Sequence, residues 1–565
     1  MSKQKDPRKA FRRNAFLSNS ADRLLLAFLV GGVLVFILYP LLCVVQTSVL
    51  PDGSVDFSAY DRLFADNGPL LTNSLFVAVL SGLLSTFLGG AVALFVHFGG
   101  GRLQKLWMGL LLMTMVSPPF IASLAYIQLF GRRGLITYRL LGLSLNPYGW
   151  QGIVAMQSLY FASQSALLLL GVLGKLDGSI LNASADLGAS PSKTLGGVVL
   201  PLLRPALLVC FLLSFIRALS DFGTPMVIGG RFNTLATEIY MQIIGYADLP
   251  LAAAMNMLLL LPTVVVFLLY RGLMRRNQAL FSAGGKQGGG TGVFHLGGVS
   301  RWLVTLPALL FFTMMVLQYG SILLGGFTKS IRGDLHFTLE HFGSLFAYNA
   351  STLVRSVVYA LVVAVCGTLF GLLLSYYIER RRIRWGGALD FIATLPYMLP
   401  GTCFGIGYLL AFNHAPLQLT GTAAIVMLNM LFKQLPIPSK AASAALAQLS
   451  TDLDRAGRDL GASRFRVLWD IVLPNLKNAF AVGFITNFAA AMTTVGSILF
   501  LINPGQKIAV FTLFDAINSG EYGVASLIST CILVITLAIS GGCAKLFLRE
   551  EGKSHGKRAG ITGLM

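Results

Sequence analysis

Long apolar runs separated by short polar segments extend along the whole chain of 565 residues. Most runs reach about 20 residues, the length at which an α-helix crosses the hydrocarbon core of a bilayer. Because backbone polar groups find no water inside a bilayer, each run is expected to be a helix that pairs them internally. The expected spans lie near 24–45, 70–98, 105–131, 151–173, 205–229, 250–272, 302–325, 351–378, 387–411, 420–441, 478–501 and 522–547.

Composition supports this interpretation, because 55% of the residues are hydrophobic and only 12% are charged. A soluble domain carries about 25% charged residues. The chain is therefore predicted to be an all-α polytopic membrane protein with about 12 transmembrane helices in two tandem six-helix repeats. No cleavage site of small residues follows the first run, so that run is expected to remain as an uncleaved helix.

A glycine-rich segment divides the chain into two parts, and its composition is typical of a flexible linker. It does not form a phosphate-binding loop, because Gln287 follows Lys286 where serine or threonine is needed. The chain is therefore not expected to be an ATPase or another enzyme. The expected organisation is a basic cytoplasmic tail at 1–23, a first repeat at 24–272, a cytoplasmic linker at 273–300, a second repeat at 301–547 and a cytoplasmic tail at 548–565.

The formal net charge of +20 could indicate a nucleic-acid partner, but the placement of the basic residues argues against one. They gather in both terminal tails and around residues 380–384. With an even number of spans these clusters fall on one side, and the positive-inside rule makes that side cytoplasmic. Three basic residues fall on the predicted outer side and do not fit: Arg132, Arg133 and Arg139.

The cysteines and histidines do not suggest a metal or cofactor site. All six cysteines lie in apolar runs without metal or disulfide spacing, and the six histidines are scattered. The cysteines are interpreted as small buried hydrophobic residues. No metal ligand, cofactor or catalytic residue is expected.

An internal repeat is the most informative motif. One constant offset along the chain, called the repeat offset below, aligns Asp186 to Ser190 with Asp459 to Ser463, and both segments read Asp-Leu-Gly-Ala-Ser. Each copy lies between the fourth and fifth runs of its half. A glycine can end one helix in the left-handed conformation, and the serine two positions later can cap the next helix. We therefore expect a helix, a turn and a second helix in each copy, with Pro201 and Pro474 where the chain turns toward the next span.

These loops resemble the signature E-A-A-x-x-x-G, nine residues, I-x-L-P of binding-protein-dependent ABC importer permeases. The nine-residue gap is kept from Gly188 to Val198 and from Gly461 to Ile471, but Asn182 and Arg455 replace the glutamate. The resemblance covers both halves of the chain. The chain is similar to the fused permeases of the ferric iron type. The resemblance implies that the loops dock the ATPase through Asn182, Ala183, Asp186, Gly188, Ser190 and Pro201, and through Arg455, Ala456, Asp459, Gly461, Ser463 and Pro474.

The resemblance also implies the partners and the location. These are two copies of a separate ABC ATPase, an extracytoplasmic solute-binding protein and the lipid bilayer, with no nucleic acid. The chain is expected in a bacterial inner membrane as a multi-pass protein with both termini in the cytoplasm.

Charged residues inside spans are costly and need a reason. Arg217 and Asp221 lie four residues apart on one helical face and could pair. Lys433 is expected to snorkel to the membrane interface. A pore or gate and a helix-packing site remain equally open for the residues Arg217, Asp221, Gly223, Thr494 and Gly496.

Prolines interrupt the third and ninth runs at Pro118, Pro119, Pro396 and Pro400. Interrupted membrane helices often line cavities, because their freed carbonyls need partners. Kinks that serve packing alone remain an open alternative.

The main hypothesis is an importer pore that carries iron(III), by resemblance to the ferric permeases. Aminoethylphosphonate, thiamine or a sugar phosphate are the alternative cargoes within the same class. A 12-helix secondary transporter is the alternative class, but residues 97–107 lack the acidic element usual in its loop between the second and third spans. A membrane receptor or scaffold is a further alternative. Neither of these two classes explains the repeated loop.

Overall fold

The computed structural model describes residues 7–51, 53–99, 103–143, 146–277, 294–331 and 334–547. Eight helices in these residues are long and apolar enough to cross a membrane, and two bent helix pairs raise the number to 10. Three shorter apolar helices lie beside them. The architecture is all-α, as predicted, and it is consistent with about 12 spans.

In the residues that the structure describes, the first half consists of helices. They are α1 (Pro7–Val33), η1 (Leu34–Leu38), α2 (Tyr39–Val49), α3 (Ser58–Phe98), α4 (Gln104–Val116), α5 (Pro119–Phe130), η2 (Leu135–Leu140), α6 (Trp150–Leu173), α7 (Gly178–Asp186), α8 (Pro191–Thr194), η3 (Leu195–Val199), α9 (Leu200–Ser220), α10 (Gly223–Ile228), α11 (Leu235–Ile244) and α12 (Leu249–Arg276).

The second half repeats this order and adds one antiparallel hairpin, β1 (Thr328–Ile331) and β2 (Asp334–Phe337), in which Thr328 pairs with Phe337. Its helices are α14 (Gly298–Gly325), α15 (Glu340–Ser344), η4 (Leu345–Asn349), α16 (Ala350–Ser375), η5 (Tyr376–Arg380), α17 (Gly386–Met398), α18 (Gly401–Ala411), α19 (Ala423–Gln434), α20 (Pro436–Gln448), α21 (Asp452–Asp459), α22 (Arg464–Val467), η6 (Leu468–Val472), α23 (Leu473–Asn475), α24 (Lys477–Thr493), η7 (Pro504–Gln506), α25 (Ala509–Asn518) and α26 (Tyr522–Phe547).

Most predicted spans agree with helices, but those near 205–229 and 478–501 end too late. Helix α9 stops at Ser220 and α24 at Thr493, because the next residues, Asp221 and Thr494, are extended with ψ of 112° and 131°. The two stops are related by the same repeat offset as the two loops. Matching helix ends therefore occur in both halves.

Both proline-interrupted runs are broken helices, as expected, although Pro396 lies inside α17 and does not break it. Pro118 and Pro400 have extended backbones with ψ of 145° and 141°. The bend is 111° between α4 and the helical segment from Phe120, and 114° between α17 and α18. A proline donates no amide hydrogen and restricts the preceding residue, so each break occurs where the sequence places one.

The prediction that the chain turns at Pro201 is wrong. Helix α8 continues through the π-helical turn η3 into α9. Proline has no backbone N–H to donate, and the altered hydrogen-bond pattern of the π turn lets the helix continue past Pro201. The equivalent turn η6 precedes Pro474, and there the chain breaks only at Leu476, before α24.

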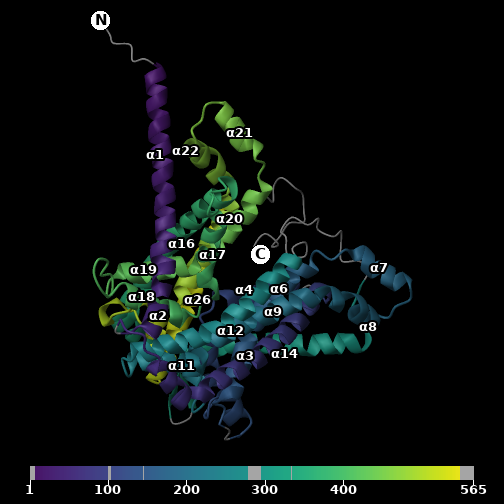
Figure 1. Ribbon diagram of the computed structural model, residues 1–565. Coiled ribbons are helices and arrows are strands. Elements are labelled where there is room, and N and C mark those ends of the chain that lie inside the picture. Colours follow the sequence, from purple (N-terminus) through teal and green to yellow (C-terminus); the bar gives the residue numbers. More distant parts are fainter. Residues whose placement is uncertain are drawn as a thin grey trace.

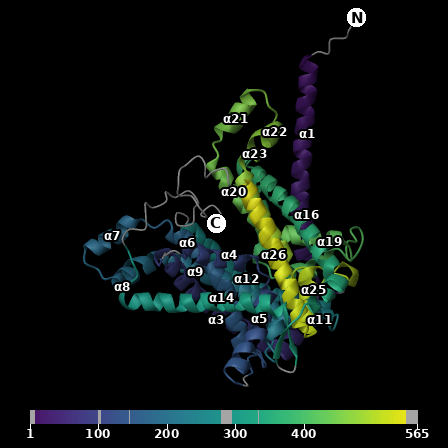
Figure 2. The same cartoon turned by 180° about the vertical axis from the view of Figure 1, so that it is seen from behind.

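The first helix of each half packs on the other half. Helix α2 contacts α18 of the second half as well as α12, while α14 contacts α3 and α5 of the first half as well as α26. Both views show α1 standing among the second-half helices and α14 lying along the first half (Figures 1 and 2). The two halves are therefore joined by a reciprocal exchange of their first helices.

An ion pair and hydrogen bonds hold α1 at Asp22, inside the helix, and α14 at its start. The Asp22 carboxylate accepts from the Arg381 guanidinium at 2.7 Å and from the Tyr377 hydroxyl at 2.9 Å. At the start of α14, the Ser300 amide donates to the Ser192 hydroxyl of α8 at 3.4 Å. Together with the contact between α1 and α22, these bonds place α1 and the start of α14 beside the repeated loops.

Cysteine burial is less complete than predicted. Cys210, Cys403 and Cys543 are buried, but Cys366 is exposed on the surface of α16. The polar tail predicted at 1–23 is helical from Pro7 onward, and α12 extends into the predicted linker as far as Arg276. The rest of that linker from 278 to 293 and the tail at 548–565 lie outside the described residues.

Candidate functional site

The two repeated loops fold alike. Gly188 and Gly461 have φ of +74° and +85°, the left-handed conformation expected at the end of α7 and α21. The Ser190 hydroxyl accepts from the Lys193 amide, and the Ser463 hydroxyl accepts from the Arg466 amide. The predicted helix, turn and capped second helix are therefore present in both copies.

Different contacts hold the two helices of each loop together. In the first copy, the hydroxyls of Ser184 and Thr194 are hydrogen bonded at 2.8 Å. The equivalent positions in the second copy are Gly457 and Val467, where a Cβ added to the glycine would lie 3.2 Å from the valine side chain. A polar bond in one copy thus corresponds to close apolar packing in the other.

The start of α7 carries an acidic cap. The Asp177 carboxylate accepts from the Ser179 amide at 2.9 Å, and this bond lowers the pKa of Asp177. A negative charge at a helix N-terminus also matches the helix dipole. The cap therefore keeps the carboxylate ionised and fixes the beginning of the first loop.

A leucine is the most exposed part of each turn. Leu187 and Leu460 have 87% and 89% of their surface exposed, and they occupy equivalent positions next to the two glycines. The predicted loop residues around them are mostly exposed as well: Asn182, Ala183, Asp186, Arg455, Ala456 and Asp459. An exposed leucine on a rigid polar turn is suited to insertion into a partner's pocket.

A cavity of about 620 Å³ lies between the halves. Helices α6 and α9 of the first half line one side, and α17, α19, α24 and α26 of the second half contribute to the other. Val116 and Leu399, the residues at the two helix breaks, are part of the wall. Of the two alternatives left open for the proline breaks, the structure supports the one in which the broken helices line a cavity.

The predicted Arg217–Asp221 pair is wrong, although both residues line the cavity. The Asp221 carboxylate accepts instead from the amides of Gly223 and Thr224 at 3.0 and 3.2 Å. Its other oxygen accepts from the Gln157 side chain at 3.0 Å. The chain leaves the helix at Asp221, which breaks the i, i+4 geometry that the prediction assumed.

Lys433 does not snorkel, and that prediction is also wrong. Its ammonium group donates to the carbonyls of Pro396 and Leu399 at 2.7 and 2.6 Å, and it lies 5.6 Å from the centre of the Phe404 ring. These carbonyls end α17 at the helix break. Lys433 therefore supplies the hydrogen bonds that the interrupted helix lacks.

An aromatic cluster from both halves adjoins the cavity. The Phe514 ring lies 5.1 Å from Phe120 and 6.3 Å from Phe222. Gly223 and Gly496 lie beside this cluster: a Cβ on Gly223 would meet Phe120 at 2.9 Å, and one on Gly496 would meet Phe222 at 3.6 Å. Of the predicted pore or gate residues, Arg217, Asp221, Thr494 and Gly496 line the cavity, while Gly223 supports its edge.

Comparison with known proteins gives the family. A family model described as the inner membrane component of binding-protein-dependent transport systems matches residues 85–278 and again residues 367–547. The chain belongs to this family. It is a two-repeat permease subunit of an ATP-binding-cassette importer, and such a subunit is not itself an enzyme.

Similar permeases carry several cargo names. The ferric transport system permease protein FbpB of Actinobacillus pleuropneumoniae is 34% identical over 491 residues, which is 83% of this chain and 70% of that protein. The molybdenum transport system permease protein ModB of Mycobacterium bovis is 32% identical over 208 residues, 34% of this chain and 75% of that protein. A Salmonella typhimurium permease named for 2-aminoethylphosphonate transport, PhnU, is 28% identical over 264 residues, 44% of this chain and 90% of that protein.

Sequence reasoning missed several residues of this permease. Leu187 and Leu460 were inside the repeated motif, so the repeat itself was the signal for them. Tyr160 and Gln164 line the cavity, but they lie in an ordinary apolar run without a motif. For Tyr160 the sequence offers one signal, because the repeat offset aligns it with Lys433.

Proposed function

We propose that this permease forms the translocation pathway for iron(III), delivered by a solute-binding protein and driven by a separate ATPase. The observation that carries the proposal is the pair of equivalent loops, each with an exposed leucine beside a left-handed glycine. Two such loops in one chain fit two copies of the ATPase, one for each loop. The residues proposed for this contact are those of the repeated motif, together with Leu187 and Leu460.

The proposed orientation places these loops, both termini and the 273–300 linker in the cytoplasm. The contact of α1 with α22 and that of α14 with α8 support one common side for them. The ring contact between Phe480 and Phe547, at 5.9 Å, adds the end of α26 to the same side. Residues 24–272 and 301–547 are the proposed permease units.

The aromatic cluster around Phe514 is the proposed outer gate. It lies beyond the ends of α9 and α24, whereas the repeated loops precede the starts of the same helices. A closed gate on one side and docking loops on the other support an alternating-access cycle, in which ATPase closure moves the two halves against each other.

Iron(III) is preferred as cargo because similarity to a ferric permease covers 83% of the chain. A phosphonate is the second candidate, supported by a relative that matches 44% of the chain. The test is uptake of radiolabelled iron, and separately growth on 2-aminoethylphosphonate, in cells with and without the gene. Iron uptake that depends on the gene supports the first cargo. If iron uptake is equal with and without the gene, and growth on 2-aminoethylphosphonate is lost without it, the phosphonate replaces iron(III) as the cargo.

A further inference from the structure

The cavity between the halves contains a cationic group whose hydrogen-bonding capacity is largely unused. The charged side chains in its described wall are Arg217, Asp221 and Lys433. Asp221 accepts three hydrogen bonds from Gly223, Thr224 and Gln157, and Lys433 donates to two carbonyls. Within the described residues, the guanidinium of Arg217 makes a single long hydrogen bond of 3.5 Å to the Tyr397 hydroxyl, although it has five N–H donors.

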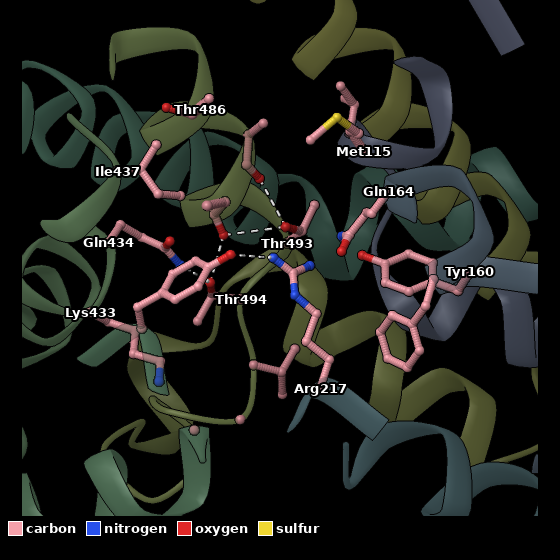
Figure 3. A pocket seen from close by; sticks show the side chains of 18 of the residues that line it. Met115, Tyr160, Gln164, Arg217, Lys433, Gln434, Ile437, Thr486, Thr493 and Thr494 are labelled. Carbon is pink, nitrogen blue, oxygen red and sulfur yellow. Dashed lines mark hydrogen bonds between the residues drawn. The ribbon is translucent and has the colours of Figure 1, made fainter. Parts of the chain in front are cut away.

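Further polar groups surround this guanidinium on the first-half wall. Figure 3 shows the side chains of Tyr160 and Gln164 directed toward Arg217 across the cavity. Ser220 also belongs to the wall, but its hydroxyl oxygen is buried and does not open into the cavity. An amide and a phenol beside a guanidinium are a set of donors suited to a small oxyanion.

The second-half wall of the cavity carries different side chains at the equivalent positions. Thr493 and Thr494 already donate their hydroxyl hydrogens to carbonyls of α24, and the Thr494 oxygen accepts from the Gln434 side chain at 3.4 Å. By the repeat offset, Arg217 corresponds to Ala490 and Gln164 to Ile437, and both of these also line the cavity. Arg217 and Gln164 therefore have apolar counterparts on the second-half wall, where Tyr397, Lys433 and Gln434 carry the polar groups.

The same groups make the cavity unsuitable for a bare metal cation. Among the described residues no three His, Cys, Asp or Glu side chains are grouped as a metal site. The carboxylate in the described part of the wall is that of Asp221, whose oxygens are already hydrogen bonded, and the available charge is the positive Arg217. A trivalent cation would need several anionic oxygen ligands, and the described wall offers one carboxylate that is already hydrogen bonded.

We propose that the cavity binds cargo through an oxyanion group, held by Arg217 with Tyr160 and Gln164. The inference rests on the proposed import function and specifies the form of its cargo. Iron would cross as a complex whose carboxylate or phosphate ligands mask the metal charge. A phosphonate would be recognised directly by the same donors.

The first experiment measures binding to the purified permease–ATPase complex by equilibrium dialysis with radiolabelled citrate and, separately, radiolabelled inorganic phosphate. Arg217→Gln is expected to weaken binding of the bound anion at least tenfold, and Arg217→Lys less. Ile437→Gln is the matched control, because it adds an amide to the opposite wall and leaves the guanidinium in place; it is expected to keep wild-type affinity. Equal affinity in Arg217→Gln and the wild type, or no anion binding by the wild-type complex, overturns the proposal.

A double variant that moves the guanidinium to another position covers the case in which Arg217→Gln does not fold. Arg217→Ala combined with Ala490→Arg moves the guanidinium to the equivalent position on the facing wall and is expected to recover part of the anion binding. Anion binding that is absent from this folded double variant, with gel filtration as the check on folding, contradicts a role for the charge.

Uptake separates this inference from the function on which it rests. Wild-type cells that take up neither iron nor phosphonate refute the import function, whatever the dialysis shows. Iron uptake that is unchanged in Arg217→Gln refutes the oxyanion site and leaves the import function intact. Reduced uptake of iron citrate identifies a chelate as the source of the oxyanion, and reduced uptake of 2-aminoethylphosphonate identifies the cargo itself.

Discussion

The turns of the two proposed docking loops require glycine because of their backbone conformation and not because of limited space. A Cβ built on Gly188 or Gly461 meets nothing within 4 Å, so a side chain there would not clash. The φ values of +74° and +85° are nevertheless in the left-handed region, where a residue with a Cβ costs about 1 kcal/mol or more. The two turns should therefore be sensitive even to alanine.

The double variant Gly188→Ala with Gly461→Ala is expected to weaken ATPase binding on the order of tenfold, because both turns lose their favoured conformation. Co-purification of the ATPase with the permease measures this, and the amount of permease in the membrane should stay the same. Gly272→Ala is the matched control, since Gly272 also has open space around it but lies within α12. Full ATPase recovery with the double variant would contradict the docking role.

Lys433 stabilises the break between α17 and α18 through the two carbonyls it binds. Lys433→Met keeps the length of the side chain and removes both hydrogen bonds, so a loss of about 2 kcal/mol in stability is expected. A thermal-shift assay in detergent measures it. Lys440→Met is the control, because the Lys440–Asp390 pair is half exposed and such pairs contribute about 1 kcal/mol or less. Equal shifts in both variants would count against this role.

At the scale of elements, the exchanged first helix depends on a small cluster of polar contacts. The side chains of Asp22 and Arg381 are 9% and 19% exposed, and Tyr377 donates to the same carboxylate. Arg380, the neighbouring residue, bonds the carbonyls of Leu446 and Leu449 near the second docking loop. The cluster thus connects α1 with the segment that leads into that loop.

Arg381→Gln is expected to destabilise the permease by about 2 kcal/mol, because it leaves a nearly buried carboxylate without its cation. The exchange of both charges, Asp22→Arg with Arg381→Asp, should restore part of the loss. Thermal shifts of the purified protein compare these variants with Arg62→Gln, which breaks an equally short but more exposed pair with Asp248. A larger shift for Arg62→Gln than for Arg381→Gln would refute the anchoring role.

The pattern of apolar residues predicted the elements well where the local sequence determines the backbone conformation. The spans, the broken helices at Pro118 and Pro400 and the capped turns after Gly188 and Gly461 follow from local rules on apolar length, proline and glycine. The contacts of Arg217, Asp221 and Lys433 did not follow, because their partners come from other helices or from a helix end that hydropathy does not mark. The position of Arg217 beside Tyr160 and Gln164 in the cavity is likewise a tertiary property.

At the scale of the whole molecule, the proposed orientation makes a prediction about labelling. In a variant without the native cysteines, Ser54→Cys should react with a membrane-impermeant maleimide in spheroplasts, because segment 46–69 is predicted outside. Gln287→Cys, in the predicted cytoplasmic linker, should react only after the membrane is opened. Labelling of Gln287→Cys in intact spheroplasts would invert the orientation. Failure of Ser54→Cys to label would contradict it as well.

The exchange of first helices also sets the order in which the molecule can be completed during synthesis. Helices α1 and α2 leave the ribosome first, but α2 packs on α18, which ends at Ala411. At about 5–20 residues per second, that contact has to wait on the order of tens of seconds. During this time α2 lies in the bilayer without its second-half partner. One late step of assembly is therefore the packing of α18 against a helix made at the very beginning.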